Sequence, residues 1–402
     1  MTTAQRRLLD AARAEARATG IPLWLVGGAV RDLALGRPPS DLDVAIDGDP
    51  RPFVAGLLAR LPARVRSGAQ FEAEPRFGTA SVRVEDARLD LARLRTERYV
   101  APGALPTVRF THDVEADLAR RDFTVNAMAL RLTDGPGERF VAPWGGLDDL
   151  AARRLRVLHD RSFVDDATRL WCGARTAALS DLVPDEAAAR LIAEGTRHLD
   201  TVSGERIAAE LRLTAARGRA GRTLALAEAW GVLRGTHPAL RLDAATARAL
   251  ARRPQPLPFE VLLALLLAPL DGRGGILARL AVPRALATTV EQAAGLLDAP
   301  DASPETLTRL AGTSEAALLA ARWLDAARPE GRQPALQRAL ARWERTRAPI
   351  DAAALMRLGI ARGPRLGATL DGLRRARYLG TLKTAADARR MALRMIEDGA
   401  PA

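Results

Sequence analysis

The sequence contains very little cysteine and few aromatic residues. Of its 402 residues only Cys172 is a cysteine, so no disulfide can form within the chain and no cysteine-rich zinc cluster is present. Aromatic residues make up 4%, whereas hydrophobic residues as a whole make up 48%, a share that is typical of a folded chain. Alanine, leucine and arginine dominate instead, and these strong helix formers favour a largely helical protein.

Long apolar runs are also missing. The most apolar stretch, "FEVLLALLLAPL" (259–270), contains Glu260 and is too short to span a bilayer. The first 20 residues are typical of an amphipathic helix and lack the apolar centre of a signal peptide. We therefore expect no membrane partner and a cytoplasmic protein.

Lysine is almost absent, although the chain is strongly basic. Lys383 is the single lysine, and arginine supplies the rest of a net charge of +12. A GC-rich genome would explain arginine in place of lysine, but not the excess over acidic residues. Arginine binds phosphate through two parallel hydrogen bonds, and basic proteins of this size commonly bind polyanions. The charge therefore predicts a nucleic-acid partner.

Strand and helix signals alternate only over the first ~150 residues. Strands are predicted within 23–27, 41–46, 79–94 and 127–132, with a turn at Glu85-Asp86 and a hairpin after 132. A short helix is predicted over 29–36, closed by Gly36. From Gly146 onward nearly all of the sequence has helical periodicity, without a fixed repeat. The pattern predicts an α/β head and a long helical remainder.

The stretch "LVGGAVRD" (25–32) places two glycines between a strand and a helix. Glycine lets the backbone approach a phosphate, and the N-terminus of the helix offers free N–H groups. Gly28 and Arg31 are therefore candidate phosphate ligands. An ordinary turn is the alternative for this stretch taken alone.

The stretch "SDLDVAI" (40–46) follows, and it predicts a pair of carboxylates. Residues two apart in a strand share a face, so Asp41 and Asp43 would project together while Leu42 and Val44 face the core. Such a pair suits Mg²⁺ bound together with substrate phosphates, and a surface acidic pair is the alternative. Asp90, in an alternating strand pattern, is a third catalytic candidate. Beside a glycine turn, these carboxylates indicate nucleotidyl transfer by two metal ions.

The whole stretch 25–46 resembles the head motif of class II tRNA nucleotidyltransferases and bacterial poly(A) polymerases, in the polymerase-β-like superfamily. The resemblance implies an α+β fold: a catalytic α/β head (1–150) followed by a helical neck that selects the nucleotide (151–220), a helical body (221–345) and a tRNA-binding helical tail (346–402). It also implies Mg²⁺-dependent addition of CCA, or part of it, from CTP and ATP to tRNA 3′ ends, with contacts to the acceptor and T arms.

Two further segments carry the resemblance. In "RRDFTVNAM" (120–128) it implies that Arg121 contacts the triphosphate and that Asp122 binds the ribose 2′-hydroxyl. In "FVDDATRLWCGARTAA" (163–178) it implies that Asp166, Arg169 and Arg175 read the base. We expect a helix to place Asp166 and Arg169 on one face. Cys172 stands where the family has a further arginine, which predicts a looser hold on the nucleotide.

The C-terminal stretch 355–388 also resembles the family's tail, and the net charge of +5 over 351–402 suits contacts to RNA phosphates. Three alternatives stay open. One is a poly(A) polymerase acting on general RNA, and another is an enzyme that adds only CC or only A. The segment 95–108 resembles a loop of A-adding members and disfavours a CC-only enzyme. The third alternative, a non-catalytic RNA-binding protein, is disfavoured by the intact Asp41 and Asp43.

Overall fold

The computed structural model describes residues 1–134, 139–253, 256–298, 312–328 and 334–397. The chain divides into two compact units, Met1–Pro238 and Ala239–Ala402, and each is described by itself below. Within the described ranges no helix is long and apolar enough to cross a membrane. The division into head, neck, body and tail at 150, 220 and 345 stays a prediction.

The first unit contains a seven-stranded sheet in the order β3-β4-β5-β2-β1-β8-β9. Its strands are β1 (Leu23–Val26), β2 (Leu42–Ile46), β3 (Gln70–Glu74), β4 (Thr79–Val84), β5 (Ala87–Arg93), β8 (Ala129–Arg131) and β9 (Phe140–Val141). All neighbours are antiparallel except β2 and β5, which run parallel. The predicted strands are confirmed, and the turn between β4 and β5 is at Glu85-Asp86, where Glu85 has φ +54°. The predicted hairpin joins β8 and β9, and part of its loop lies outside the described residues.

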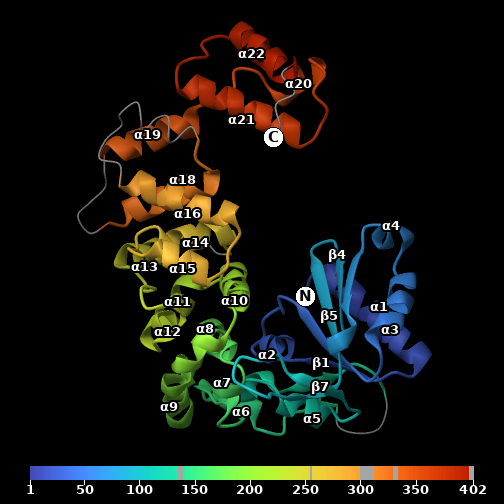
Figure 1. The fold of residues 1–402 in the computed structure, drawn as a ribbon. Coiled ribbons are helices and arrows are strands. Elements are labelled where there is room, and N and C mark those ends of the chain that lie inside the picture. Colours follow the sequence, from blue (N-terminus) through green and yellow to red (C-terminus); the bar gives the residue numbers. More distant parts are fainter. Residues whose placement is uncertain (135–138, 254–255, 299–311, 329–333, 398–402) are drawn as a thin grey trace. The chain divides into compact units, whose positions relative to one another are not determined.

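One face of this sheet is covered by α1 (Thr3–Thr19) and α3 (Pro50–Ala59), which lie side by side in Figure 1. Thr2 and Gln5 form a reciprocal capping box that fixes the start of α1. The alternation predicted for β2 is confirmed, because Leu42 and Val44 are buried in the core beneath these helices. Asp43 therefore points to the opposite face of the sheet.

The first unit also contains shorter elements and the first helices beyond the sheet. These are α2 (Gly28–Ala34), α4 (Ala63–Arg66), η1 (Pro75–Phe77), α5 (Val114–Ala119), η2 (Thr124–Asn126), α6 (Gly146–Ala151), α7 (Ser162–Asp165), α8 (Thr168–Ser180), α9 (Glu186–Gly195), η3 (Thr196–Thr201), α10 (Gly204–Ala216), α11 (Ala220–Ala229) and α12 (Val232–Thr236). Two small two-stranded sheets join β6 (Arg95–Arg98) to β7 (Thr107–Phe110) and β10 (Arg154–Leu155) to β11 (Val183–Pro184). The α/β head predicted before Gly146 and the helices predicted after it are both confirmed.

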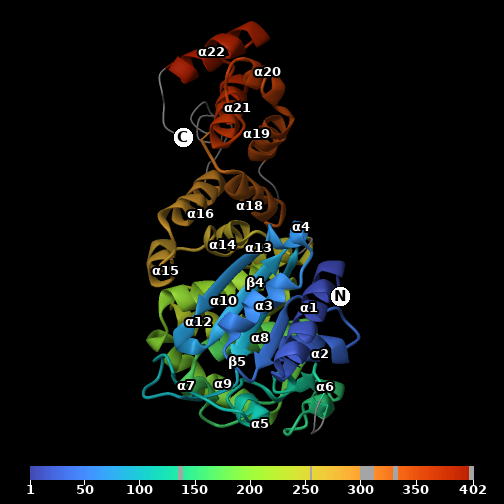
Figure 2. The ribbon, with the colours of Figure 1, turned by 90° about the vertical axis from the view of Figure 1, so that its right-hand side faces the viewer.

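The second unit is helical throughout its described residues. Its helices are α13 (Ala244–Ala251), α14 (Phe259–Leu267), α15 (Arg273–Arg279), α16 (Arg284–Leu297), α18 (Glu315–Ala326), α19 (Pro334–Arg345), α20 (Ala352–Arg357), α21 (Pro364–Tyr378) and α22 (Ala385–Glu397). Helices α14, α16 and α18 pack on one another, as Figure 2 shows. Helix α14 is the apolar run 259–270, and it is buried along most of its length. The α+β class predicted from the sequence is confirmed.

Candidate functional site

The glycine turn lies at the end of β1, where the backbone leaves the sheet. Gly27 has φ +66° and ψ −134°, a conformation that L side chains rarely adopt. A Cβ at this position would lie 2.9 Å from Nη1 of Arg121 and 4.0 Å from Oδ2 of Asp43. Gly28, the glycine singled out from the sequence, is the first residue of α2. The turn therefore brings its backbone next to an arginine and a carboxylate, and Gly27 is the residue that permits this.

Three carboxylates and a serine form a row across four adjacent strands. Asp43 of β2 is in register with Asp90 of β5, Asp90 with Ser81 of β4, and Ser81 with Glu72 of β3. Residues in register point to the same face of a sheet, so this row faces away from the core beneath α1 and α3. The prediction that Asp90 joins the carboxylates of β2 thus has a geometric basis in the parallel pairing of β2 and β5.

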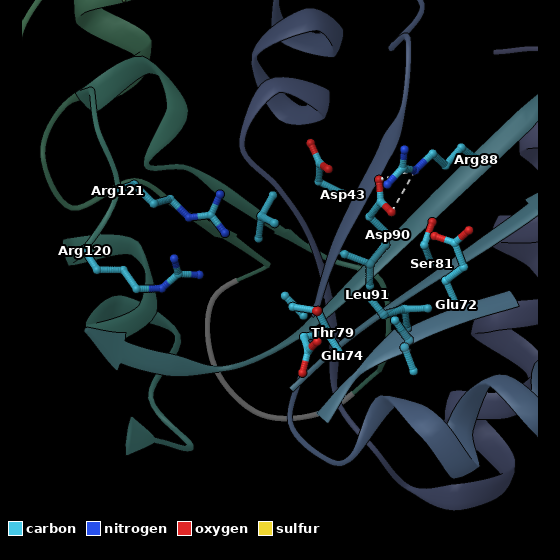
Figure 3. Close-up of a pocket in the computed structure, with 15 residues that line it drawn as sticks. Asp43, Glu72, Glu74, Thr79, Ser81, Arg88, Asp90, Leu91, Arg120 and Arg121 are labelled. Carbon is cyan, nitrogen blue, oxygen red and sulfur yellow. Dashed lines mark hydrogen bonds and ion pairs between the residues drawn. The ribbon is translucent and has the colours of Figure 1, made fainter. Parts of the chain in front are cut away.

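The row borders a cleft of about 740 Å³. Figure 3 shows Arg120 and Arg121 on one side of the cleft and Glu72, Arg88 and Asp90 on the other, with Asp43 between them. Arg88 pairs with Asp90 at 2.9 Å. The cleft therefore presents carboxylates opposite arginines, an arrangement that can bind cations and phosphates together.

Asp43 is the carboxylate most affected by its surroundings. Burial, with the charge of Asp90 beside it, raises the pKa of Asp43 to about 6, although Arg121 and Arg217 act in the opposite direction. Asp41 lies directly before β2, and it adds to the repulsion. It forms an ion pair with Arg217, which is the C-cap of α10. The local excess of negative charge is what a cation would relieve.

These carboxylates fit Mg²⁺ in its usual protein environment. Mg²⁺ is commonly held by one or two carboxylates together with substrate phosphates. Over the described part of the chain, no group of three or more His, Cys, Asp or Glu side chains could hold a metal ion by itself. Hard oxygen donors at Asp41 and Asp43, close to one another beside the cleft, suit the phosphate-assisted mode.

The arginine that approaches Gly27 is held by one carboxylate. Arg121 donates from Nη2 to Oδ2 of Asp117 at 3.1 Å, and its buried Nε has no partner among the described residues. Burial alone would raise the pKa of Asp117, but Arg121 and Arg120 hold it below the ordinary value. Asp117 therefore stays ionised and fixes both arginines at the edge of the cleft.

Arg31 is directed to protein groups in this structure. Its guanidinium donates from Nη1 to Oδ1 of Asn126 at 2.7 Å, and from Nη2 and Nε to Asp32 at 2.8 and 3.1 Å. The side chain is buried, with 6% of the residue exposed. Its predicted contact with phosphate stays a prediction, and its observed partners link α2 to the segment 120–128.

Asp122 is fixed by three different donors. Its Oδ1 accepts from the backbone N–H of Phe123 at 2.8 Å and from Nδ2 of Asn126 at 3.1 Å, and its Oδ2 accepts from Sγ of Cys172 at 3.0 Å. Burial, together with the nearby charge of Asp122, raises the pKa of the Cys172 thiol, so the thiol remains a donor. Cys172 therefore connects the helix α8 to the carboxylate that the family resemblance assigns to ribose binding.

The predicted placement of Asp166 and Arg169 on one face of a single helix is wrong. Asp166 has an extended backbone (φ −145°, ψ 99°) in the break between α7 and α8, so no single helix carries both side chains. Its oxygens accept from Nη2 of Arg206, both at 2.8 Å, and from the backbone and hydroxyl of Thr168. The helical periodicity of the sequence did not indicate this break, at which the carboxylate of Asp166 accepts from the first residue of α8.

The two predicted arginines of α8 are likewise paired with protein groups. Arg169 donates to Oγ of Ser162 at 3.0 Å and to the carbonyl of Arg120 at 2.7 Å. Arg175 forms an ion pair with Glu210 of α10. Asp166, Arg169 and Arg175 thus lie in a network that connects α7, α8 and α10 to the cleft.

Several residues of the site were not predicted from the sequence. They are Gly27, Glu72, Glu74, Ser81, Arg88, Arg120, Asn126, Arg206, Glu210 and Arg217. The alternation in "QFEAE" (70–74) could have indicated Glu72 and Glu74, because both project from one face of a strand. Arg206 and Arg217 carry no such signal, since their partners are 40 and 176 residues away.

Known proteins similar to this chain belong to one group. The family profile described as the poly A polymerase head domain matches residues 23–156. A CC-adding tRNA nucleotidyltransferase of Deinococcus radiodurans is 34% identical over 378 residues, which cover 92% of this chain and 88% of that protein. An A-adding tRNA nucleotidyltransferase of Halalkalibacterium halodurans is 41% identical over 196 residues, which cover 48% of this chain and 44% of that protein.

A solved structure adds the likeness of the fold. The apo form II of a CCA-adding enzyme covers 98% of this chain and 96% of its own, with a TM-score of 0.67 and 23% identity. The likeness extends over both units of the chain.

Proposed function

The chain belongs to the tRNA nucleotidyltransferase family, and from that membership we propose that it extends tRNA 3′ ends with CCA, or part of it, using CTP and ATP. The register pair Asp43 and Asp90, facing Arg120 and Arg121 across one cleft, carries this proposal. Its setting would be the cytoplasm, and its RNA partner would be bound by the 3′ end and the acceptor and T arms.

The head would supply the chemistry of transfer. Asp41 and Asp43 would hold Mg²⁺, which lowers the pKa of an attacking hydroxyl and stabilises the charge on a leaving pyrophosphate. Asp90, in register with Asp43, would keep this charge cluster favourable to cations. Arg121 would hold the triphosphate, because it has a buried Nε without a partner among the described residues and lies against the glycine turn. Gly28 and Arg31 would complete the phosphate-binding turn.

The helices after the head would select the nucleotide. Asp122 would accept the ribose 2′-hydroxyl, and the network of Asp166, Arg169 and Arg175 would present fixed donors and acceptors to the base. Rigid hydrogen-bonding groups can replace a template because they match the edge of one base and leave another unpaired. The two named relatives differ in the nucleotide they add, so the proposal includes the partial products CC and A.

The product length tests the proposal directly. The protein is incubated with a tRNA that ends at the discriminator base, with Mg²⁺ and with CTP, ATP or both. We expect an extension of at most three nucleotides whose length depends on which nucleotides are supplied. Asp43→Ala is the matched inactive control, and it should retain tRNA binding.

Each alternative gives a distinct product. Continued addition of A to general RNA would identify a poly(A) polymerase. Two added residues with CTP alone, and no further addition with ATP, would identify a CC-adding enzyme. Addition only to tRNA that already ends in CC would identify an A-adding enzyme. No incorporation, with tRNA binding intact, would contradict the proposal and leave an RNA-binding protein.

A further inference from the structure

Arg217 reaches from the helical part of the first unit to the catalytic strand. Its Nη1 donates to Oγ of Ser40, and its Nη2 donates to Oδ2 of Asp41. Both side chains of the ion pair are partly exposed, 26% for Arg217 and 30% for Asp41. The guanidinium of Arg217 therefore contacts the carboxylate of Asp41, which the proposed function assigns to the binding of a divalent cation.

The position of Arg217 is fixed by the turn that carries it. Helix α10 ends at Ala216, and Arg217 is followed by Gly218 (φ +76°) and Arg219 (φ +53°). Arg219 donates to the carbonyl of Ala178 at 2.9 Å and to Asp181 at 2.8 Å, which anchors the turn to the end of α8. The guanidinium is thus presented by an anchored turn.

The segment that carries Asp41 is fastened to the same place. Arg37 donates to the carbonyl of Leu179 at 2.6 Å, near the end of α8. On the other side, Gln5 of α1 donates to the carbonyl of Pro39 at 2.8 Å. Asp41 is therefore held within reach of Arg217 by contacts that do not involve its own carboxylate.

We propose that Arg217 is the protein's own counter-ion at the catalytic carboxylates, and that a divalent cation must displace its guanidinium from Asp41 in order to bind. This inference rests on the proposed function, in which Asp41 is a cation ligand. Asp41, Asp43 and Asp90 repel one another, and one positive side chain reduces that repulsion in the free protein. The same positive charge opposes a cation, so the free protein binds divalent cations more weakly than its carboxylates alone would allow.

A cation titration of the whole chain without nucleotide tests this. Free Mn²⁺ is measured by electron paramagnetic resonance in the presence of wild type, Arg217→Gln, Arg217→Lys and Arg222→Gln. Arg222 is the matched control, because it lies close along the chain and pairs with Asp181 at 3.2 Å instead of with the carboxylates. We expect Arg217→Gln to bind Mn²⁺ about three- to tenfold more tightly, Arg217→Lys to stay near wild type, and Arg222→Gln to be unchanged.

A double-mutant comparison separates this inference from the proposed function. In an Asp41→Asn background the effect of Arg217→Gln should disappear, because the carboxylate for which Arg217 and Mn²⁺ compete is absent. Unchanged or weaker Mn²⁺ binding by Arg217→Gln, while tRNA extension by wild type still depends on Asp41, would overturn the inference alone. Absence of any tRNA extension by wild type would instead overturn the proposed function. Thermal unfolding of each variant confirms that the fold is retained.

Discussion

At the scale of single residues, Asp43 shows how a carboxylate proposed to bind a cation opposes stability. Asp43 lies beside Asp90 of β5, and the other side chains of its own strand, β2, are buried in the core. Its pKa is raised to about 6, so the folded protein disfavours its ionised form. A residue that costs stability and faces a cleft is a typical feature of an active site.

Asp43→Asn should stabilise the protein and abolish nucleotide transfer. Above pH 6 the carboxylate is ionised in both folded and unfolded states, and the folded state bears the cost of burying the charge. Below about pH 4 it is neutral in both states, so the cost disappears. We expect the variant to gain about 1–3 kcal/mol in the free energy of unfolding at pH 8 and almost nothing at pH 4, without metal. Denaturant unfolding at the two pH values measures this, and a gain that is larger at pH 4 would contradict the assignment.

Gly27→Ala should lower the activity by more than its loss of stability alone would explain. Alanine at φ +66° and ψ −134° is strained, and its Cβ would displace Nη1 of Arg121. Gly20→Ala is the matched control, because Gly20 also has positive φ (+70°) but nothing lies within 4 Å of the added Cβ. We expect both to lose about 1–2 kcal/mol of stability, and only Gly27→Ala to lower kcat/KM for nucleotide by tenfold or more. Equal kinetic losses in the two variants would show that general strain is responsible.

Cys172→Arg should strengthen the hold on the nucleotide. The thiol now donates to Asp122, and Arg175 and Glu210 are its charged neighbours. An arginine there would add a charge-assisted donor worth about 1.5–3 kcal/mol beside two carboxylates that can balance its charge. We expect KM for CTP or ATP to fall about tenfold or more on the same tRNA. Unchanged KM values, with Cys172→Ser as the control for loss of the thiol, would show that the missing family arginine has no effect here.

At the scale of elements, the site depends on cross-links between α8, α10 and the segment before α8. Arg206 of α10 holds both oxygens of Asp166 and also donates to the carbonyl of Gly103 at 3.5 Å. Arg175 and Glu210 form a second link between α8 and α10. The Arg175–Glu210 and Arg206–Asp166 pairs together connect α8, α10 and the segment before α8 into one support for the residues proposed to read the base.

Arg206→Gln should therefore alter the choice of nucleotide more than the binding of RNA. Without the guanidinium, Asp166 loses the nitrogen that donates to both of its oxygens, and its Oδ2 keeps no partner from Thr168, which donates only to Oδ1. Arg161→Gln is the control, because the exposed Arg161 pairs at 3.1 Å with Asp165, the residue directly before Asp166. We expect the ratio of kcat/KM for CTP and ATP to change by about tenfold in Arg206→Gln and by less than twofold in Arg161→Gln. An unchanged ratio in Arg206→Gln would remove Asp166 from the selecting network.

At the scale of the whole molecule, part of the excess positive charge lines a hollow in the second unit. Its lining contains no acidic side chain and consists of Arg342, Arg345, Thr346, Arg347, Pro349, Arg377, Lys383 and Ala385. A concave surface of one charge attracts phosphate and releases counterions when RNA binds. The hollow lies at the ends of α19 and α21 and the start of α22, and we predict that the proposed RNA partner binds there.

The triple substitution Arg345→Gln, Arg347→Gln, Lys383→Gln should weaken tRNA binding and reduce its dependence on salt. If each side chain contacts one phosphate, the slope of log affinity against log salt should decrease in magnitude by about 2 to 3. Arg389→Gln with Arg390→Gln is the control, since both side chains are exposed on the same tail outside the hollow. Filter binding between 50 and 300 mM salt measures the slopes. A slope equal to that of wild type would exclude the hollow as a phosphate-binding surface.

The sequence by itself determined the elements and the local motifs. The alternation of polar and apolar residues in 41–46 places Leu42 and Val44 in the core and Asp43 on the other face. The two glycines after β1 predict a tight turn. These features follow from the period of a strand and from the conformations of glycine, both of which act over a few residues. The change to helical periodicity after Gly146 likewise depends only on residues a few positions apart.

Only the tertiary structure decided which of these residues meet. The parallel pairing of β2 with β5 sets Asp90 beside Asp43, and the turn after α10 brings Arg217 to Asp41, 176 residues away. The break at Asp166 takes this residue out of the helix that carries Arg169 and leaves it paired with Arg206. Ion pairs and strand registers of this kind depend on how distant segments pack, and no local pattern in the sequence encodes the choice between one arginine and another.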